Sequence, residues 1–233
     1  MPKKKNKKID LYTFIYNDED FLPFFLDYYS FVDSLTFIDS GSTDNSLNII
    51  KKWAIPSHPL VRVAQTGLTW WDHDTLHEFR NEIWKDSRAD IVFFPDCDEI
   101  FFHPDMKNFL DNSIFDIFEM DGYEMVWPEM PPAGSSILQV NTGVPFHIYD
   151  KSTIFNPRVE IEFLNAHLRY TRCTNVNIGD IKLLHYRSLG LSYMLKRRDR
   201  IKSRTPRGYI QIDTDQQVKE KHARLMREAK VVI

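Results

Sequence analysis

The chain has 233 residues, of which 42% are hydrophobic and 14% aromatic, so it can bury one large core as a single domain. Its formal net charge of −3 provides no overall attraction to nucleic acid, and no nucleic-acid partner is expected. Two cysteines, Cys97 and Cys173, are too few for a disulfide framework, so the composition favours a reducing, cytoplasmic setting.

The N-terminal residues 1–8 form a lysine-rich tail that is expected to be disordered. Acidic residues at 18–20 interrupt the apolar stretch behind this tail, so no signal peptide is predicted. No stretch reaches the ~20 consecutive apolar residues of a membrane span. A peripheral contact of the lysine tail with an anionic membrane surface is left open.

Strands and helices alternate over the first part of the chain. The predicted strands cover residues 9–16, 35–38, 61–64 and 91–94, and the predicted helices cover residues 21–32, 47–53 and 75–85. Such alternation is typical of a parallel sheet with right-handed crossovers. The carboxyl ends of all four strands should therefore meet at one edge of the sheet, where open α/β sheets bind ligands.

The second part of the chain has a different pattern. Short, aromatic, β-rich segments at 115–126 and 146–170 are separated by prolines and glycines, which predicts an antiparallel addition to the sheet. A further strand is expected at 181–186. Helices are expected at 189–202, which is dense in basic residues, and at 216–229.

An acidic cluster follows the most apolar of the predicted strands. Asp96, Asp98 and Glu99 come directly after Ile91–Phe94, and three carboxylates at one strand end repel one another unless a cation joins them. The simplest candidate is Mg²⁺ or Mn²⁺, held by one or two carboxylates and by phosphate oxygens of a substrate. The structural alternative is that these acids begin a solvated loop or cap the next helix.

A second polar loop follows the strand at 35–38. Asp39 stands at the strand end, Gly41 permits a tight turn, and Ser42 or Thr43 can cap the next helix. A plain strand-to-helix turn accounts for this pattern without a ligand. An acid at a strand end can also accept hydrogen bonds from a nucleoside, and the nearby acidic cluster favours that interpretation.

Four motifs in this order are similar to those of glycosyltransferases of the GT-A fold, in particular the large family-2 group and its relatives in bacteria and large viruses. They are Tyr16-Asn17-Asp18-Glu19, Ile38-Asp39-Ser40-Gly41-Ser42-Thr43-Asp44, Arg80-Asn81 and Asp96-Cys97-Asp98-Glu99. The resemblance implies a nucleotide-sugar donor, most simply a UDP-sugar, a divalent cation (Mn²⁺ or Mg²⁺), and transfer to a hydroxyl of a glycan or glycoconjugate, as in polysaccharide biosynthesis.

The resemblance also implies a fold and a domain organisation. The fold is α/β, a GT-A domain with a Rossmann-like nucleotide-binding half, a mostly parallel central sheet, a smaller antiparallel β part on the acceptor side, and C-terminal helices. A single domain is expected over 1–233. Its parts are the tail 1–8, the nucleotide-sugar-binding half 9–103, the acceptor-side half 104–188 and the C-terminal helices 189–233.

Roles for individual residues follow from the resemblance. Metal ligation is implied for Asp98, His185 and Asp96, and nucleotide-sugar binding for Asp18, Asp39, Arg80, Asp96 and Arg187. Within this set Asp39 resembles the uracil contact, Arg80 the group facing the diphosphate, and Asp96 a ribose or metal-water contact. Alternatives remain open: Arg80 as an exposed helix residue, His185 as a core histidine, and His167 in place of His185.

The catalytic base is where the sequence departs from the family. No Glu-Asp pair follows the acidic cluster, although an inverting transferase needs a carboxylate near the acceptor hydroxyl. Glu129, Glu160 and Glu162 are the candidate bases, and Asp121 is a further one. Inversion is favoured, and a retaining mechanism stays open.

Other classes fit the sequence less well. A sugar nucleotidyltransferase shares the fold but needs a basic, glycine-rich loop after the first strand, where this chain is acidic. A phosphatase with a nucleophilic aspartate usually carries its acids on the first strand. A non-catalytic GT-A-like module that binds a glycan or a partner is the third alternative. The basic run 196–207 is interpreted as a solvated helix face or as a flap over the donor diphosphate.

Overall fold

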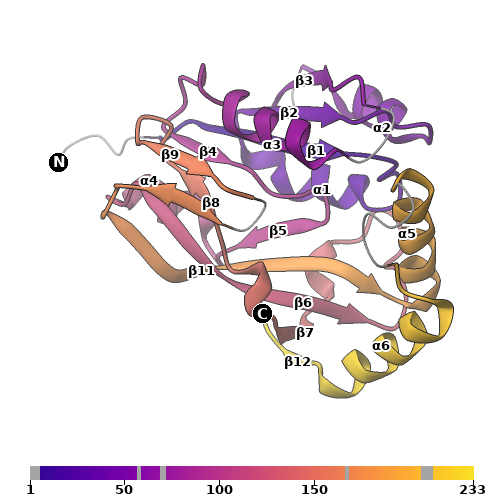
Figure 1. Ribbon diagram of the computed structural model, residues 1–233. Helices are drawn as coiled ribbons and strands as arrows, with labels where there is room; N and C mark the ends of the chain where they lie inside the picture. The colour runs from indigo at the N-terminus through magenta and orange to yellow at the C-terminus, as the bar shows by residue number, and fades with distance from the viewer. Residues whose placement is uncertain (1–5, 57–58, 69–71, 166–167, 206–211) are drawn as a thin grey trace.

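The computed structural model describes residues 6–56, 59–68, 72–165, 168–205 and 212–233. Within these residues a ten-stranded sheet runs through the molecule, and a separate two-stranded hairpin lies beside it (Figure 1). No helix in the described part of the chain is both long and apolar enough to cross a membrane.

The first half builds the parallel part of the sheet. Its strands lie in the order β4-β1-β2-β3, and all of these pairs are parallel. The elements are β1 (Ile9–Ile15), α1 (Leu22–Tyr28), η1 (Tyr29–Phe31), β2 (Ser34–Asp39), α2 (Ser46–Trp53), β3 (Leu60–Gln65), α3 (His73–Glu82) and β4 (Ile91–Phe93). The strand–helix alternation predicted from the sequence is confirmed here.

The second half extends the same sheet beyond β4. The order continues as β12-β7-β6-β8-β4, in antiparallel pairs, while β11 pairs parallel with β6 and antiparallel with β5. The elements are β5 (Glu99–Phe102), α4 (Met106–Asn112), β6 (Ile117–Trp127), η2 (Ile137–Gln139), β7 (Thr142–Pro145), η3 (His147–Tyr149), β8 (Lys151–Phe155), β9 (Ile161–Phe163), β10 (Arg169–Thr171), β11 (Val176–Leu189), α5 (Leu191–Arg204), α6 (Asp215–Glu228) and β12 (Lys230–Val231). The predicted α/β class with an antiparallel addition is confirmed, whereas the parallel β6–β11 pair is not evident from the sequence.

Side chains of β1 alternate between two hydrophobic cores, one on each face of the sheet. Ile9, Leu11 and Ile15 belong to the larger core, which the buried residues of α1 also join. Tyr12 belongs to the smaller core on the other face, together with Trp84, which follows α3. Covering both faces is what keeps the backbone of a parallel sheet away from water.

Helices α5 and α6 lie at the end of the sheet toward which β6 and β11 point (Figure 1). Gly190, between β11 and α5, has φ +86°, a left-handed conformation that favours glycine. A Cβ atom at this position would lie 2.7 Å from both the Cα atom of Glu129 and the carbonyl oxygen of Pro128. The first turn of α5 therefore packs closely against the segment that follows β6.

Candidate active site

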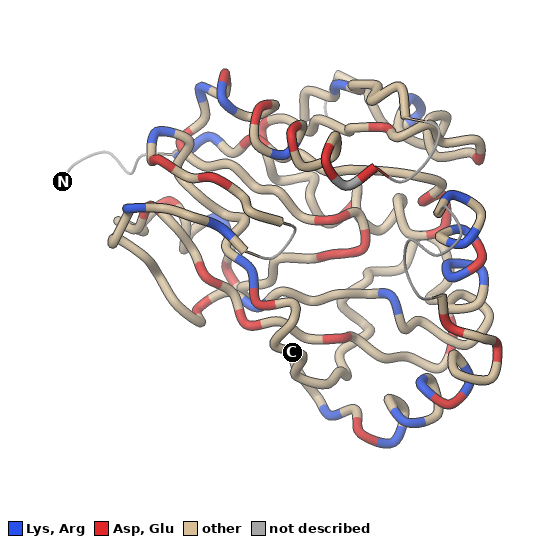
Figure 2. Tube along the Cα trace, viewed as in Figure 1, with Lys and Arg blue, Asp and Glu red and all other residues tan. Residues whose placement is uncertain are grey.

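A cavity of about 440 Å³ lies at the carboxyl ends of β1, β2 and β4, between α3 and α5. Acidic residues lie near the centre of the molecule, and Lys and Arg recur along α5 at its edge (Figure 2). The acidic, basic and histidine side chains that line the cavity are Asp18, Asp74, His77, Arg80, Asp96, Asp98, His185, Arg197, Arg200 and Arg204. This is the sheet edge at which open α/β folds bind ligands.

The loops after β1 and β2 are held together by hydrogen bonds. Asn17 has φ +54°, which asparagine tolerates better than most residues, and its Oδ1 accepts hydrogen bonds from the backbone N–H groups of Thr43 (2.6 Å) and Asp44 (3.1 Å). The Asn17 backbone N–H donates to Ser42 Oγ at 3.0 Å. Two of the sequence motifs thus form one rigid rim of the cavity.

Asp18 is partly buried and Asp39 is fully buried, and they occupy different places. Asp18 lines the cavity, and its Oδ1 lies 2.8 Å from Nη1 of Arg200; burial raises the pKa of Asp18 although Arg200 opposes this. Asp39 is 1% exposed and accepts a hydrogen bond from the Ser42 backbone N–H at 2.9 Å. Asp39 lies beneath the rim, and its neighbour Ser40 lines the cavity.

Asp96 sits between two cations. Its Oδ1 lies 3.1 Å from Nη2 of Arg80, and its Oδ2 lies 2.8 Å from Nζ of Lys151. Burial disfavours the charged carboxylate, but Lys151 and Arg80 hold the pKa of Asp96 well below its usual value. Lys151 also contacts Glu99 Oε1 at 2.5 Å, so one lysine joins two of the three clustered acids.

Arg80 presents a hydrogen-bond donor to the cavity. Its guanidinium carbon lies 4.6 Å from the ring centroid of Phe94 and 5.3 Å from that of Phe14, which fixes the plane of the group. Nη2 binds Asp96, whereas Nη1 is buried and has no hydrogen-bond partner among the described residues. A buried guanidinium nitrogen without an acceptor is costly, and an anionic oxygen of a ligand would satisfy it.

Asp98 faces Arg197 and His185. Its Oδ2 accepts hydrogen bonds from Arg197 Nη2 (2.7 Å) and Nε (3.1 Å), and its Oδ1 lies 3.4 Å from His185 Nε2. Burial opposes ionisation, but Arg197 and His185 hold the pKa of Asp98 well below its usual value. On the other side of the imidazole, Nδ1 of His185 lies 3.5 Å from Oε2 of Glu124. The histidine is therefore oriented between two carboxylates.

The geometry of Asp98 and His185 fits a divalent cation. Two ligands that are each about 2.1 Å from one ion lie roughly 3 Å apart, and the Asp98 Oδ1 to His185 Nε2 distance is 3.4 Å. Among the described residues no group of three or more His, Cys, Asp or Glu side chains is placed to hold a metal. A Mg²⁺ or Mn²⁺ ion bound here would therefore take most of its coordination from water and from the substrate.

Two buried residues of the site were not found by sequence reasoning. Lys151 lies on β8 and Glu124 on β6, and each comes from a part of the chain with no motif around it. Glu124 accepts hydrogen bonds from Ser188 Oγ at 2.5 Å and Tyr149 Oη at 3.0 Å. Burial raises the pKa of Glu124, but His185 and its other partners outweigh this and lower it to about 2. The signal that the sequence offered for both residues was a charged side chain within a predicted β-rich segment, 115–126 for Glu124 and 146–170 for Lys151.

The described part of the basic run, residues 196–205, has one side at the cavity and one side on the surface. Arg197, Arg200 and Arg204 line the cavity, and the Arg204 guanidinium lies 4.1 Å from the ring centroid of Tyr16. Lys196 instead pairs on the surface with Asp20 at 2.7 Å. Side chains at positions 197, 200 and 204 share one face of a helix, so that face meets the cavity.

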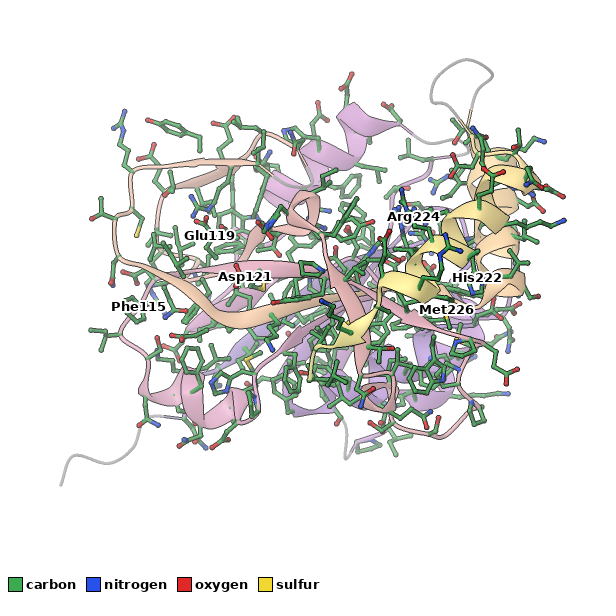
Figure 3. The ribbon with its side chains drawn as sticks, turned by 90° about the horizontal axis from the view of Figure 1, so that it is seen from below. Phe115, Glu119, Asp121, His222, Arg224 and Met226 are labelled. Atoms are coloured by element: carbon green, nitrogen blue, oxygen red, sulfur yellow. The ribbon has the colours of Figure 1, made fainter. Side chains whose placement is uncertain are left out.

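The remaining predicted residues lie outside the cavity. Glu129, Glu160 and Glu162 are exposed and are not among its lining residues. Asp121, labelled in Figure 3 with Glu119 of the same strand β6, is exposed and does not line the cavity. Arg187 pairs with Glu124 at 3.1 Å and lines a smaller neighbouring cavity. His167 lies outside the described residues.

Comparisons with known proteins support the fold. No family model and no curated protein matches the chain. Among solved structures, S. aureus TarS 1–349 in complex with UDP matches with a TM-score of 0.52 and 16% identity over 93% of this chain and 70% of that chain. A second structure of S. aureus TarS 1–349 matches with a TM-score of 0.51 and 15% identity over 84% of this chain and 65% of that chain.

A third structure, of S. aureus TarS, matches with a TM-score of 0.51 and 14% identity, over 93% of this chain and 43% of that chain. This chain thus spans less than two thirds of the length of two of these structures. TarS is a glycosyltransferase of the GT-A fold, and the chain described here has the same fold. The GT-A fold predicted from the sequence motifs is confirmed.

Proposed function

We propose that this chain is a glycosyltransferase that moves a sugar from a UDP-sugar donor to a hydroxyl of a glycan or glycoconjugate. The observation that carries this proposal is the cavity at the strand ends, where buried guanidinium groups face the Asp96–Asp98 pair. A nucleoside diphosphate needs this arrangement, because negative charge builds up on it as the sugar departs. The UDP bound to TarS, a protein of the same fold, supports UDP as the nucleotide.

Arg80 and Arg200 are the side chains that we assign to the donor diphosphate. Arg80 Nη1 is a buried donor without a partner in the described part of the chain, and Arg200 lies at the rim that joins the loops after β1 and β2. Asp96 then acts through Arg80, because its carboxylate holds the guanidinium in place. We assign the nucleoside end of the donor to the rim loop at Ser40, which lines the cavity directly after the buried Asp39.

A divalent cation, Mn²⁺ or Mg²⁺, is part of this proposal. Asp98 and His185 would hold it, and when bound it neutralises charge on the leaving diphosphate. Glu124 orients His185 from the opposite side of its ring, which keeps Nε2 directed at Asp98. Arg197, which contacts the same carboxylate, limits the position that the Asp98 side chain can adopt.

An inverting reaction stays part of the proposal and requires a carboxylate at the acceptor hydroxyl. Asp74, at the start of α3, lines the cavity, and no ion pair engages it among the described residues. Asp18, Asp96 and Asp98 line the cavity too, but each is held by an arginine. We therefore add Asp74 as a candidate base ahead of Glu129, Glu160 and Glu162.

The test is a screen of UDP-sugars for slow donor hydrolysis, followed as UDP release, with Mn²⁺ present and with the metal removed by EDTA. We expect one UDP-sugar to be hydrolysed in a metal-dependent manner. The Asp98→Asn variant, which keeps the shape of the side chain, should lose at least 100-fold in rate, equivalent to about 3 kcal/mol. The matched control is Lys202→Ala, which removes a charge from the exposed face of α5.

If UDP binds neither with the metal nor without it, the assignment of a UDP-sugar as the donor is wrong. Binding of UDP without turnover of any UDP-sugar would favour the non-catalytic module. Release of pyrophosphate from UTP and a sugar phosphate would instead favour a nucleotidyltransferase.

A further inference from the structure

A second cavity, of about 220 Å³, lies between β11, α5 and α6, beside the candidate active site. Arg197 and Ile201 line both cavities, so α5 forms the wall between them. We call the second one the α5–α6 cavity. Its other basic lining residues are Arg187, Arg198 and Lys221, and Asp213 is the one acidic residue among the described residues that line it.

The three arginines of the α5–α6 cavity are positioned by carboxylates outside it. The pairs are Arg187 Nε with Glu124 Oε2 at 3.1 Å, Arg197 Nη2 with Asp98 Oδ2 at 2.7 Å, and Arg198 Nη2 with Asp215 Oδ1 at 2.7 Å. Arg197 Nε also contacts Asp98 Oδ2, and Arg198 also contacts Asp199 Oδ1 through Nε and the Asp213 carbonyl oxygen through Nη1. Each guanidinium has five N–H donors, so at least two remain on each group for a further acceptor. The three guanidinium groups are thus held in place before any ligand binds.

Lys221 differs from these arginines. It is half-buried on α6, and its ammonium group makes no hydrogen bond or ion pair with any described residue. Burial, and then the positive charge of Arg187, lower the pKa of Lys221, which Glu124 and Asp213 only partly oppose. A half-buried ammonium group facing an arginine is unfavourable unless an anion lies between them.

We propose that the α5–α6 cavity binds a phosphate group carried by the acceptor and thereby selects phosphorylated acceptors; this rests on the function proposed above. Planar guanidinium groups suit phosphate, which can accept two parallel hydrogen bonds from each. A volume of about 220 Å³ equals roughly seven water molecules, enough for a phosphate and part of the sugar that carries it.

The position of the cavity assigns this anion to the acceptor and not to the donor. The proposed function assigns the donor diphosphate to Arg80 and Arg200, which line the first cavity and not the α5–α6 cavity. A molecule anchored at Lys221 meets the first cavity at Arg197 and Ile201, the residues that both cavities share. That is where an acceptor hydroxyl could approach a sugar held in the first cavity.

The experiment measures binding to protein that is saturated with UDP and Mn²⁺, so that phosphate cannot occupy the first cavity. The probes are glucose 6-phosphate, glucose and inorganic phosphate, followed by calorimetry. We expect glucose 6-phosphate to bind at least tenfold more tightly than either of the other two. The Lys221→Gln variant should weaken its binding at least fivefold and leave UDP affinity unchanged. The control is Lys219→Gln, an exposed lysine on the same helix, which should change neither value.

A second readout separates binding from folding. Because Lys221 is repelled by Arg187, the Lys221→Gln variant should unfold at the same temperature as the unmodified protein or higher. Retained glucose 6-phosphate binding in this variant overturns the proposal. Equal affinity for inorganic phosphate and glucose 6-phosphate overturns the acceptor assignment and indicates a free-anion site. Failure of UDP itself to bind bears on the proposed function alone. The α5–α6 cavity is then tested by the difference in glucose 6-phosphate affinity between the unmodified protein and Lys221→Gln, because Lys221 lines only that cavity.

Discussion

At the scale of single residues, Lys151 decides the charge balance at the floor of the candidate active site. Its side chain is 1% exposed and contacts both Asp96 and Glu99. Burial lowers the pKa of Lys151, but the two acids outweigh burial and raise it, so the group remains a cation. The Lys151→Met variant leaves the buried Glu99 carboxylate and the partly exposed Asp96 carboxylate without this partner. We expect it to lower the free energy of unfolding by about 3–5 kcal/mol, measured by urea denaturation.

The control for this prediction is Lys85→Met. Lys85 also lies 2.5 Å from a carboxylate, that of Glu82, but both side chains are more than half exposed. Solvent screens such a pair, so we expect a loss of no more than about 1 kcal/mol. Equal losses in the two variants would mean that burial does not set the strength of the Lys151 contacts.

Asp74 provides the second prediction at this scale. If it deprotonates the acceptor, the Asp74→Asn variant should lose at least about 100-fold in kcat for transfer while UDP affinity changes less than twofold. The measurements are initial rates with an acceptor and calorimetric binding of UDP. Glu129→Gln, at an exposed position outside the cavity, is the control and should keep its rate. A larger loss in Glu129→Gln than in Asp74→Asn would return the base to the position predicted from the sequence.

At the scale of elements, the junction between β11 and α5 controls the placement of the cavity arginines. Gly190 combines a positive φ with a Cβ direction that is blocked by the backbone of residues 128–129. We expect Gly190→Ala to destabilise the protein by about 2–3 kcal/mol and to weaken UDP binding at least tenfold, because α5 carries Arg197 and Arg200. Thermal unfolding and calorimetry with UDP measure the two effects.

Gly134 is a matched control for Gly190. It has φ +80°, but a Cβ atom there would meet nothing within 4 Å. Gly134→Ala therefore carries the backbone strain without the steric clash, and it lies outside the cavity. We expect it to cost about 1 kcal/mol and to leave UDP binding unchanged. If both variants lose UDP binding, the packing of α5 against residues 128–129 is not the cause.

At the scale of the whole molecule, the first cavity lies between the parallel half of the sheet and helix α5. Arg197 and Arg200 of α5 pair with Asp98 and Asp18, so the C-terminal part is tied to the loops of the parallel half. A ligand bound between them should stabilise the entire fold. We expect UDP with Mn²⁺ at 100 times its Kd to add about 2.7 kcal/mol and to raise Tm by about 5–10 °C. A Tm unchanged by saturating UDP would contradict this.

The parallel half was predictable because its signals are local. Apolar runs of strand length, polar strand ends and helical spacing follow one another in residues 9–100, and each can be recognised without knowing its neighbours. The same signals brought Asp18, Arg80, Asp96 and Asp98 to one sheet edge, where the structure also has them. For these residues sequence order and position in space are linked by the rule that parallel strands end together.

The sequence by itself thus determined the α/β class, the sheet edge that carries the site, and the acids after β4. Only the tertiary structure decided which cationic side chains meet those acids: Lys151 from β8 and Arg197 from α5. His185, for which the resemblance had implied a place beside Asp98, does lie next to that residue. The physical reason is the distance along the chain. Local propensity cannot specify which distant strand or helix will lie against a given carboxylate, because that choice depends on packing of the whole sheet. The α5–α6 cavity was not predictable from the sequence either, because its lining residues come from separate elements, β11, α5 and α6, that meet only in the folded chain.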